Sequence, residues 1–146
     1  MRVSSADGSF SLVPPSGWSV NTSYTMPDGT KTVLVVAGPV DSGIQAHLIV
    51  VVNKIYVEPS MLKEEWNRRV ELGTVQQIGA VEDTLLGGLP AVRAQYQASD
   101  GDIEYLTTDR GGKTYLFSFS ASLSQFQRLW TTEVQKMLSS LTWSGA

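Results

Sequence analysis

The hydrophobic pattern changes its period within residues 113–143, and this change predicts how the domain ends. Apolar side chains alternate over the first part, as in a strand that buries one face: Tyr115, Phe117, Phe119 and Ala121. From Phe126 onward the apolar residues recur at intervals of one, three or four, which is the spacing of an amphipathic helix. Ser122 and Gln125 have the form of a capping box at the join. We therefore predict an aromatic strand that leads directly into a long helix.

The chain before residue 113 is predicted to form strands with one further helix. The expected strands cover residues 9–13, 18–20, 31–36, 43–53, 75–86, 91–98 and 103–108. The strand at 43–53 is apolar on both faces except for Gln45 and His47, so we expect it at the centre of a sheet. A helix is predicted from Pro59 to Leu72, because proline is favoured in a first helical turn.

Glycine-containing dipeptides mark the turns between the later strands. Gly87-Gly88 can supply positive φ in a tight turn, and Asp100-Gly101 is a hairpin signal. The order of strands, helix, strand meander and long helix predicts one α+β domain over residues 1–146. Its expected architecture is an antiparallel β-sheet flanked by helices, an α/β/α sandwich. A cone-shaped sheet around a ligand cavity is the alternative.

Several short segments resemble the PsbP/DcrB-like group, which includes Mog-type Ran-binding proteins, LpqN-type mycobacterial lipoproteins and Eag-type chaperones of type VI secretion. Phe10-Ser11-Leu12 with Pro15-x-Gly17-Trp18 resembles the group's N-terminal signature. Gly87-Gly88-Leu89-Pro90-Ala91 is similar to its mid-sheet turn, and residues 115–141 are similar to its closing strand and helix. The resemblance follows nearly the whole chain in order. It implies the Mog-like fold and a non-catalytic accessory domain that contacts other proteins, in many members as part of a lipoprotein.

Composition and charge narrow the possible functions by exclusion. The chain has 146 residues, a formal net charge of -3 and no cysteine. The missing cysteines exclude disulfides and thiolate sites, and the acidic balance argues against a nucleic-acid surface. The apolar stretch at 48–52 is too short to cross a bilayer. Residues 1–7 lack the apolar run of a signal peptide, so we expect an extracytoplasmic location only if a leader was removed, and a cytoplasmic one otherwise.

Candidate chemistry is sparse, and we predict no catalytic residue, no cofactor and no metal site. His47 is the only histidine, and its place in the middle of a strand favours a structural role. Residues 60–63 match the S-x-x-K motif of serine acylases, but the companion motifs are missing. Weak divalent-ion binding stays open at three neighbouring carboxylates: Asp100, Asp102 and Glu104.

Two classes of function remain from the sequence. The first is a protein-binding accessory domain with an unidentified partner, or an Eag-type secretion chaperone. The second is a small ligand-binding or enzymatic domain with a pocket around His47. The candidate pocket or surface consists of polar strand residues: Gln45, His47, Arg93, Gln95 and Gln97. A pocket that holds His47 beside a carboxylate would favour an enzyme, whereas an exposed apolar patch would favour protein binding. The sequence leaves the oligomeric state open.

Overall fold

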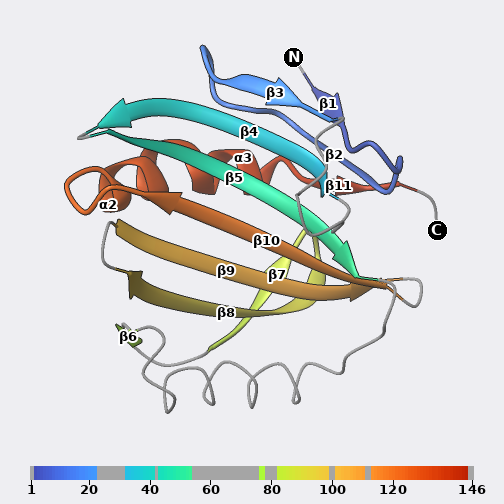
Figure 1. Ribbon diagram of the computed structural model, residues 1–146. Coiled ribbons are helices and arrows are strands. Elements are labelled where there is room, and N and C mark those ends of the chain that lie inside the picture. Colours follow the sequence, from blue (N-terminus) through green and yellow to red (C-terminus); the bar gives the residue numbers. More distant parts are fainter. Residues whose placement is uncertain are drawn as a thin grey trace.

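A computed structural model describes residues 2–22, 32–41, 43–53, 76–77, 82–98, 101–110 and 113–144, and a large antiparallel sheet is its main feature (Figure 1). The strands of this sheet are β3 (Ser19–Asn21), β4 (Thr32–Asp41), β5 (Ile44–Asn53), β6 (Gln76–Gln77), β7 (Glu82–Leu86), β8 (Leu89–Ala98), β9 (Gly101–Arg110) and β10 (Lys113–Ala121). Their order is β3-β4-β5-β10-β9-β8-β6, with β7 also paired to β8. The strand over 43–53 thus lies inside the sheet, as predicted.

A second, small sheet joins the two ends of the chain. It consists of β1 (Val3–Ser4), β2 (Phe10–Leu12) and β11 (Thr142–Trp143), in the order β1-β2-β11. The sequence pattern did not predict β11, because two residues are too few to show a period. β11 pairs with β2 and places Trp143 opposite Phe10. The last described strand therefore lies beside a strand from the start of the chain.

The C-terminal helical run covers one face of the large sheet. It consists of α2 (Phe126–Leu129), the π-helical turn η1 (Trp130–Val134) and α3 (Gln135–Ser139). The predicted succession of strand and helix is confirmed, since alternate side chains of β10 are buried against this run. The ring of Phe119 lies 5.4 Å from that of Phe126 and 6.2 Å from that of Trp130, measured between centroids.

The expected capping box is not formed at the start of the helical run. The Ser122 hydroxyl donates a hydrogen bond to Asp41 Oδ2 at 2.6 Å instead of accepting one from the backbone. Gln125 occupies the N-cap position without a side-chain cap. The backbone N–H groups of Gln125 and Phe126 both donate to the Ser122 carbonyl, and the helix begins three residues later than the box requires.

The α+β class and the antiparallel sheet are confirmed, but the α/β/α sandwich needs correction. Within the described residues the helical run lies on one face only, and helices do not flank both sides of the sheet. The opposite face carries Gln45, His47, Ser118 and Ser120, none of which is fully buried. The helix predicted at 59–72 lies outside the described residues.

Two strand boundaries differ from the predicted ones. β4 passes through Gly38-Pro39 to Asp41, with a register shift between Ala37 and Val40. The irregularity accommodates a proline, which has no N–H for the ladder. The predicted strand over 75–86 is described as β6 and β7, which pair with different parts of β8. In the parts of the chain described, we find no helix with the length and apolar character of a membrane span.

Candidate functional site

The hairpin of β7 and β8 forms the first wall of the candidate site. Gly87 and Gly88 form its turn with φ values of 58° and 85°, and positive φ at both positions is what a type I′ turn requires. The predicted turn is therefore confirmed. The adjacent leucines of β7 point to opposite sides: Leu86 is 2% exposed in the core, whereas Leu85 is 69% exposed.

The turn is held against the end of the chain. The Trp143 indole Nε1 donates a hydrogen bond to the Leu86 carbonyl at 3.0 Å. A methyl group added at Gly87 would lie 2.4 Å from Leu141 Cδ2 and 2.7 Å from Trp143 Nε1, so this position has room for glycine alone. The tip of the hairpin therefore packs against the residues that follow the helical run.

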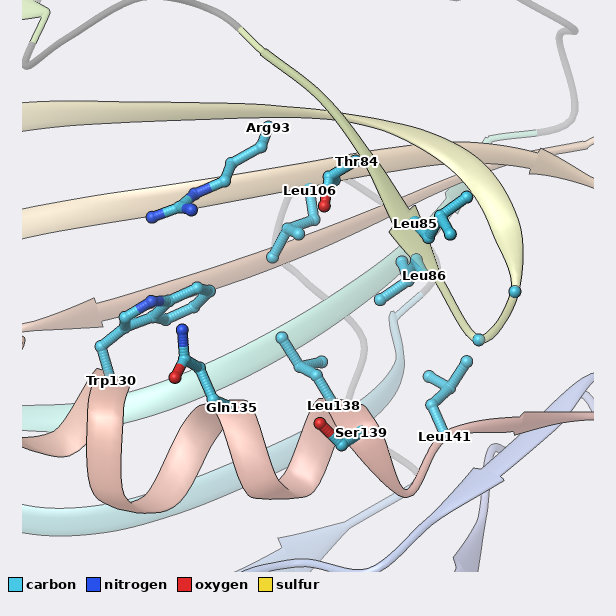
Figure 2. A pocket seen from close by; sticks show the side chains of 12 residues that line it. Thr84, Leu85, Leu86, Arg93, Leu106, Trp130, Gln135, Leu138, Ser139 and Leu141 are labelled. Atoms are coloured by element: carbon cyan, nitrogen blue, oxygen red, sulfur yellow. The ribbon is translucent and has the colours of Figure 1, made fainter.

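A cavity of about 590 Å³ lies between this hairpin and the helical run (Figure 2). We call it the groove. Its lining residues are Thr84, Leu85, Leu86, Gly87, Gly88, Arg93, Leu106, Trp130, Gln135, Leu138, Ser139 and Leu141. Five of them are exposed and form the rim: Leu85, Gly87, Gly88, Gln135 and Ser139. The groove is therefore open to solvent, and its lining combines leucine side chains with polar groups.

Arg93 and Trp130 form one end of the groove, where their side chains point toward each other (Figure 2). The guanidinium carbon of Arg93 lies 5.3 Å from the centroid of the Trp130 ring, within the range of a cation–π contact. Among the described residues that line the groove, Arg93 is the one with a charge, and Glu82 lies opposite it in the pairing of β7 and β8. The positive charge at this end is therefore next to an acidic residue of the same hairpin.

The π-helical turn changes which side chains the helix presents to the groove. A π turn contains more residues than an α turn, so it shifts the following residues around the helix axis. Trp130 and Val134 are buried at the two ends of this turn, and the next residue, Gln135, lines the groove. The distortion thus places an amide beside the indole and the guanidinium.

The register of the sheet separates the residues that the sequence grouped into one pocket or surface. Arg93 pairs with Leu106, Leu106 with Phe117, and Phe117 with Val50. Cross-strand partners share a face, and Phe117 and Val50 belong to the core, so Arg93, Gln95 and Gln97 lie on the helix-bearing face. His47 and Gln45 are an odd number of residues from Val50 in the same strand and lie on the opposite face. Of these five, only Arg93 lines the groove.

Comparison with known proteins adds information about the fold. No family model and no curated protein matches the sequence. Cyanobacterial PsbP (CyanoP) from Synechocystis sp. PCC 6803 matches with a TM-score of 0.68 at 13% identity, over 99% of this chain and 92% of that one. LpqN from Mycobacterium tuberculosis matches with a TM-score of 0.62 at 13% identity, over 99% and 90%. The chain has a PsbP/LpqN-like fold. A Bacteroides thetaiotaomicron protein matches with a TM-score of 0.58 at 11% identity, over 99% of this chain and 48% of that one.

His47 forms a hydrogen-bonded pair with a serine on the other face of this PsbP/LpqN-like sheet. Its Nε2 lies 3.0 Å from Ser120 Oγ, and its Nδ1 lies 3.0 Å from the Gln45 carbonyl oxygen. The carbonyl accepts from Nδ1–H, so Nε2 is the acceptor for the serine hydroxyl. None of the hydrogen bonds described for His47 involves a carboxylate. The serine lies in β10, between two paired strands, where the ladders engage the backbone N–H groups that an oxyanion hole would need.

Two carboxylates have structural hydrogen bonds away from the groove. Asp41 accepts from the hydroxyls of Ser122 and Ser124, and these bonds lower its pKa below the ordinary value of 3.8. Asp7 accepts from the hydroxyls of Ser5 at 2.7 Å and Ser9 at 2.6 Å. Burial raises the pKa of Asp7, but these hydrogen bonds outweigh it, so the pKa also lies below 3.8. Both carboxylates fasten loops to the rest of the fold.

The sequence left weak binding of a divalent ion open at three carboxylates, and the structure does not test this prediction. Asp100 lies outside the described residues, and the side chains of Asp102 and Glu104 are not described. Among the side chains that are described, none form a group of three or more histidine, aspartate or glutamate residues suited to a metal ion.

The groove itself was missed by sequence reasoning, although Arg93 was a candidate. Trp130 was assigned to the core, and it is indeed 6% exposed, but its ring also borders the cavity. One signal was present in the sequence. Successive side chains in a strand point to opposite faces, so Leu85-Leu86 must expose one leucine.

Proposed function

We propose that this chain is a non-catalytic accessory domain that binds a segment of a partner protein in the groove. The observation that carries the proposal is the open groove that has leucines in its lining, with Leu85 exposed at its rim. A single exposed leucine is ordinary on a protein surface, but this one continues the apolar lining of a cavity.

The dimensions and lining of the groove support binding. Ligand pockets typically have volumes of about 300–1,000 Å³, with mostly apolar walls and a few polar groups that fix orientation. The groove has a volume of about 590 Å³, and Leu86, Leu106 and Leu141 form its buried apolar part. Arg93 and Gln135 supply polar groups at one end.

The non-catalytic part of the proposal is supported by the setting of the Ser120–His47 pair. A nucleophile needs an acidic or carbonyl partner for its base, and donors for the developing oxyanion. The Gln45 carbonyl can orient His47, but the serine lies on a sheet face whose backbone is engaged in strand pairing. The bond therefore serves as a cross-strand contact between β5 and β10.

The structural neighbours are compatible with this role. One is a cyanobacterial PsbP, and another, LpqN, is involved in cell envelope biogenesis. A lipoprotein setting and an Eag-type chaperone role stay predictions.

Peptide selection tests the proposal without knowledge of the partner. Peptides are selected from a random library on the immobilised full chain, and their affinity is then measured for Leu85→Glu and for Leu123→Glu. Leu123 is 54% exposed and does not line the groove, so it is a matched control. We expect Leu85→Glu to weaken binding about tenfold or more, and Leu123→Glu to leave it unchanged. Equal binding by the two variants would contradict the proposal.

A further inference from the structure

We propose that the bound segment has an extended conformation and adds as a strand to the outer edge of β7, with Leu85 at the centre of the contact. The inference rests on the proposed function, since it names the backbone conformation of the segment and the way in which it is held. It is drawn from the register of the β7–β8 hairpin, which directs main-chain groups of Leu85 away from the sheet.

The two-residue turn determines which main-chain groups of β7 face outward. Leu86 and Leu89 flank the Gly87-Gly88 turn, and in a hairpin with a type I′ turn of two residues the flanking positions exchange both N–H···O bonds. From there, hydrogen-bonded and non-hydrogen-bonded pairs alternate along the ladder. Leu85 is therefore in a non-hydrogen-bonded pair, and its N–H and C=O point away from β8.

The sequence of β8 and the described hydrogen bonds agree with this register. The partner of Leu85 is Pro90, which has no N–H to donate and therefore suits a position that is not bonded to β7. Among the described strands, β7 pairs with β8 alone. Within the described part of the chain, the main-chain N–H and C=O of Leu85 have no hydrogen-bond partner. Both groups can therefore bind a further strand.

The outer edge of β7 has little of the protection that edge strands normally have. Natural sheets protect such edges with charged residues, proline or a bulge. β7 has charges only at its start, in Glu82 and Asp83, while Thr84, Leu85 and Leu86 carry none. Leu85 is also 69% exposed, so an apolar side chain lies beside the outward backbone groups. The edge therefore fits a segment whose residue opposite Leu85 is apolar.

An added strand would also direct side chains toward the groove. Cross-strand neighbours share a face, so residues opposite Thr84 and Leu86 would point to the helix-bearing face, where both of these residues line the groove. Leu138 and Gln135 of the helical run line the same space (Figure 2). Alternate side chains of the segment would thus contact Leu85 and the groove, which combines backbone hydrogen bonds with side-chain selection.

The size of the edge favours a partner segment over a second copy of the chain. The five residues of β7 extend over about 17 Å. An interface through this edge alone would bury much less than the roughly 1,200 Å² of a stable dimer. Charge also restricts the segment. Glu82 and Asp83 are exposed and make the start of the edge acidic, so an acidic residue of the segment is unfavourable beside them.

The test replaces single backbone N–H groups by N-methyl groups in peptides selected on the wild-type chain. N-methylation removes one hydrogen-bond donor and keeps every side chain. A strand added to β7 donates to it only from every second residue. We therefore expect affinities measured by fluorescence anisotropy to fall about tenfold or more at alternate positions of the peptide, with binding kept at the positions between them.

Two variants of Leu85 test the same contact from the side of the protein. L85P removes the outward N–H, whereas L85T keeps it and also loses the leucine side chain, so L85T is the matched control. Because this N–H lies outside the β7–β8 ladder, the edge strand can accept proline there. We expect L85P to bind the peptides about tenfold or more weakly than L85T. Circular dichroism shows whether both variants are folded, and if L85P is not, the N-methyl series decides alone.

The possible outcomes separate this inference from the proposed function. Peptides that are weakened by Leu85→Glu but accept N-methylation at every position would overturn strand addition and leave the groove as a binding site. Equal affinity of folded L85P and L85T would overturn it in the same way. Peptides that bind Leu85→Glu and Leu123→Glu equally well would contradict the proposed function, and the inference with it. Sedimentation velocity is measured in parallel. A dimer that is lost in L85P and kept in L85T, with no groove-dependent peptide, would overturn the partner segment and identify a second copy of the chain.

Discussion

Arg93 and Arg110 stack on tryptophans at almost the same distance, but their surroundings differ. Arg110 lies over Trp143, whose ring also contacts Phe10 at 5.5 Å and Tyr115 at 5.1 Å between centroids. We call these rings, with Phe117, the aromatic cluster. Arg93 lies over Trp130 beside a cavity of about 590 Å³. The first pair belongs to a packed region and the second to an open one.

The difference shows that a pairwise contact does not define a function by itself. In the aromatic cluster the indole N–H is bound to the Leu86 carbonyl, and the arginine is bound to Ser144, so the contacts hold the hairpin and the chain end together. Beside the groove the same contact supports a charge next to an apolar space. The predictions below test whether the aromatic cluster is a stabilising region and the groove a binding region.

The largest effect is expected from Phe117→Ala in the aromatic cluster. The side chain is fully buried, with its ring 5.3 Å from Phe10 and 6.3 Å from Trp143 between centroids. Truncation leaves a cavity among rigid rings that cannot collapse, so we expect the free energy of unfolding to fall by about 3–5 kcal/mol. Urea denaturation followed by circular dichroism measures this change.

Leu138→Ala is the matched truncation beside the groove. Leu138 is half-buried and already borders an open space, so its removal should lower the free energy of unfolding by only about 1 kcal/mol. Similar losses for the two variants would show that the groove is as important for stability as the cluster, and would remove the distinction between them.

The next effect concerns the turn that connects the two regions. Gly87→Ala should lower the free energy of unfolding by about 2–4 kcal/mol, because the new methyl group clashes with Leu141 and Trp143 at a residue with positive φ. Gly88→Ala is the control, since its φ is 85° but nothing lies within 4 Å of the added group. We expect a loss of about 1 kcal/mol there from backbone strain alone. Equal losses of stability at Gly88 and Gly87 would mean that backbone strain causes the loss, and not the clash with Leu141 and Trp143.

Much of the fold could be predicted because its signals are local. The alternation through Phe117 and Phe119, the helical spacing after Phe126 and the Gly87-Gly88 turn each lie within a few residues, and the structure confirms them. Local patterns were less informative where tertiary contacts compete. Ser122 has the spacing of a helix cap, but its hydroxyl donates to Asp41 from a distant part of the chain, and the helix begins after Gln125.

The candidate site was harder to predict because it depends on register and on contacts between distant residues. The alternation of β5 shows that Gln45 and His47 share a face, and the alternation of β8 shows that Arg93 and Gln95 do. Whether these two faces coincide depends on the pairing through β10 and β9, and the register places them on opposite sides. The groove similarly depends on the approach of Leu86 to Trp143, which no local pattern contains.

A smaller effect on stability is expected from the two arginine substitutions. R110Q removes a cation–π contact and a hydrogen bond to Ser144, so we expect a loss of about 1–2 kcal/mol in the free energy of unfolding. R93Q should lose a comparable amount, because Arg93 makes the same type of contact with Trp130 and lies opposite Glu82 in the pairing of β7 and β8. Urea midpoints of the two variants measure these losses. A much larger loss for R110Q would show that the packed region depends more strongly on its arginine than the open region does.

The smallest effect is expected from acid and involves Asp7, which hydrogen-bonds to Tyr115 of the aromatic cluster at 3.4 Å. Because the pKa of the folded-state carboxyl lies below 3.8, the folded protein binds the proton more weakly than the unfolded chain does. Its contribution to stability is therefore present above the ordinary pKa and is lost as the pH falls through the lower folded value. We expect Asp7→Asn to be less stable than the wild type at neutral pH, with the difference shrinking below about pH 4.

Asp41→Asn provides the comparison for Asp7, because the pKa of Asp41 is also lowered, chiefly by the Ser122 hydroxyl. Each carboxylate accepts hydrogen bonds from two serine hydroxyls, so we expect the acid-dependent change of Asp41→Asn to be about as large as that of Asp7→Asn. Urea midpoints of the wild type and both variants between neutral pH and about pH 3 measure the two changes. A larger acid dependence for Asp41→Asn would mean that the hydrogen bonds of Asp41 at the start of the helical run contribute more to stability than those of Asp7 beside the aromatic cluster.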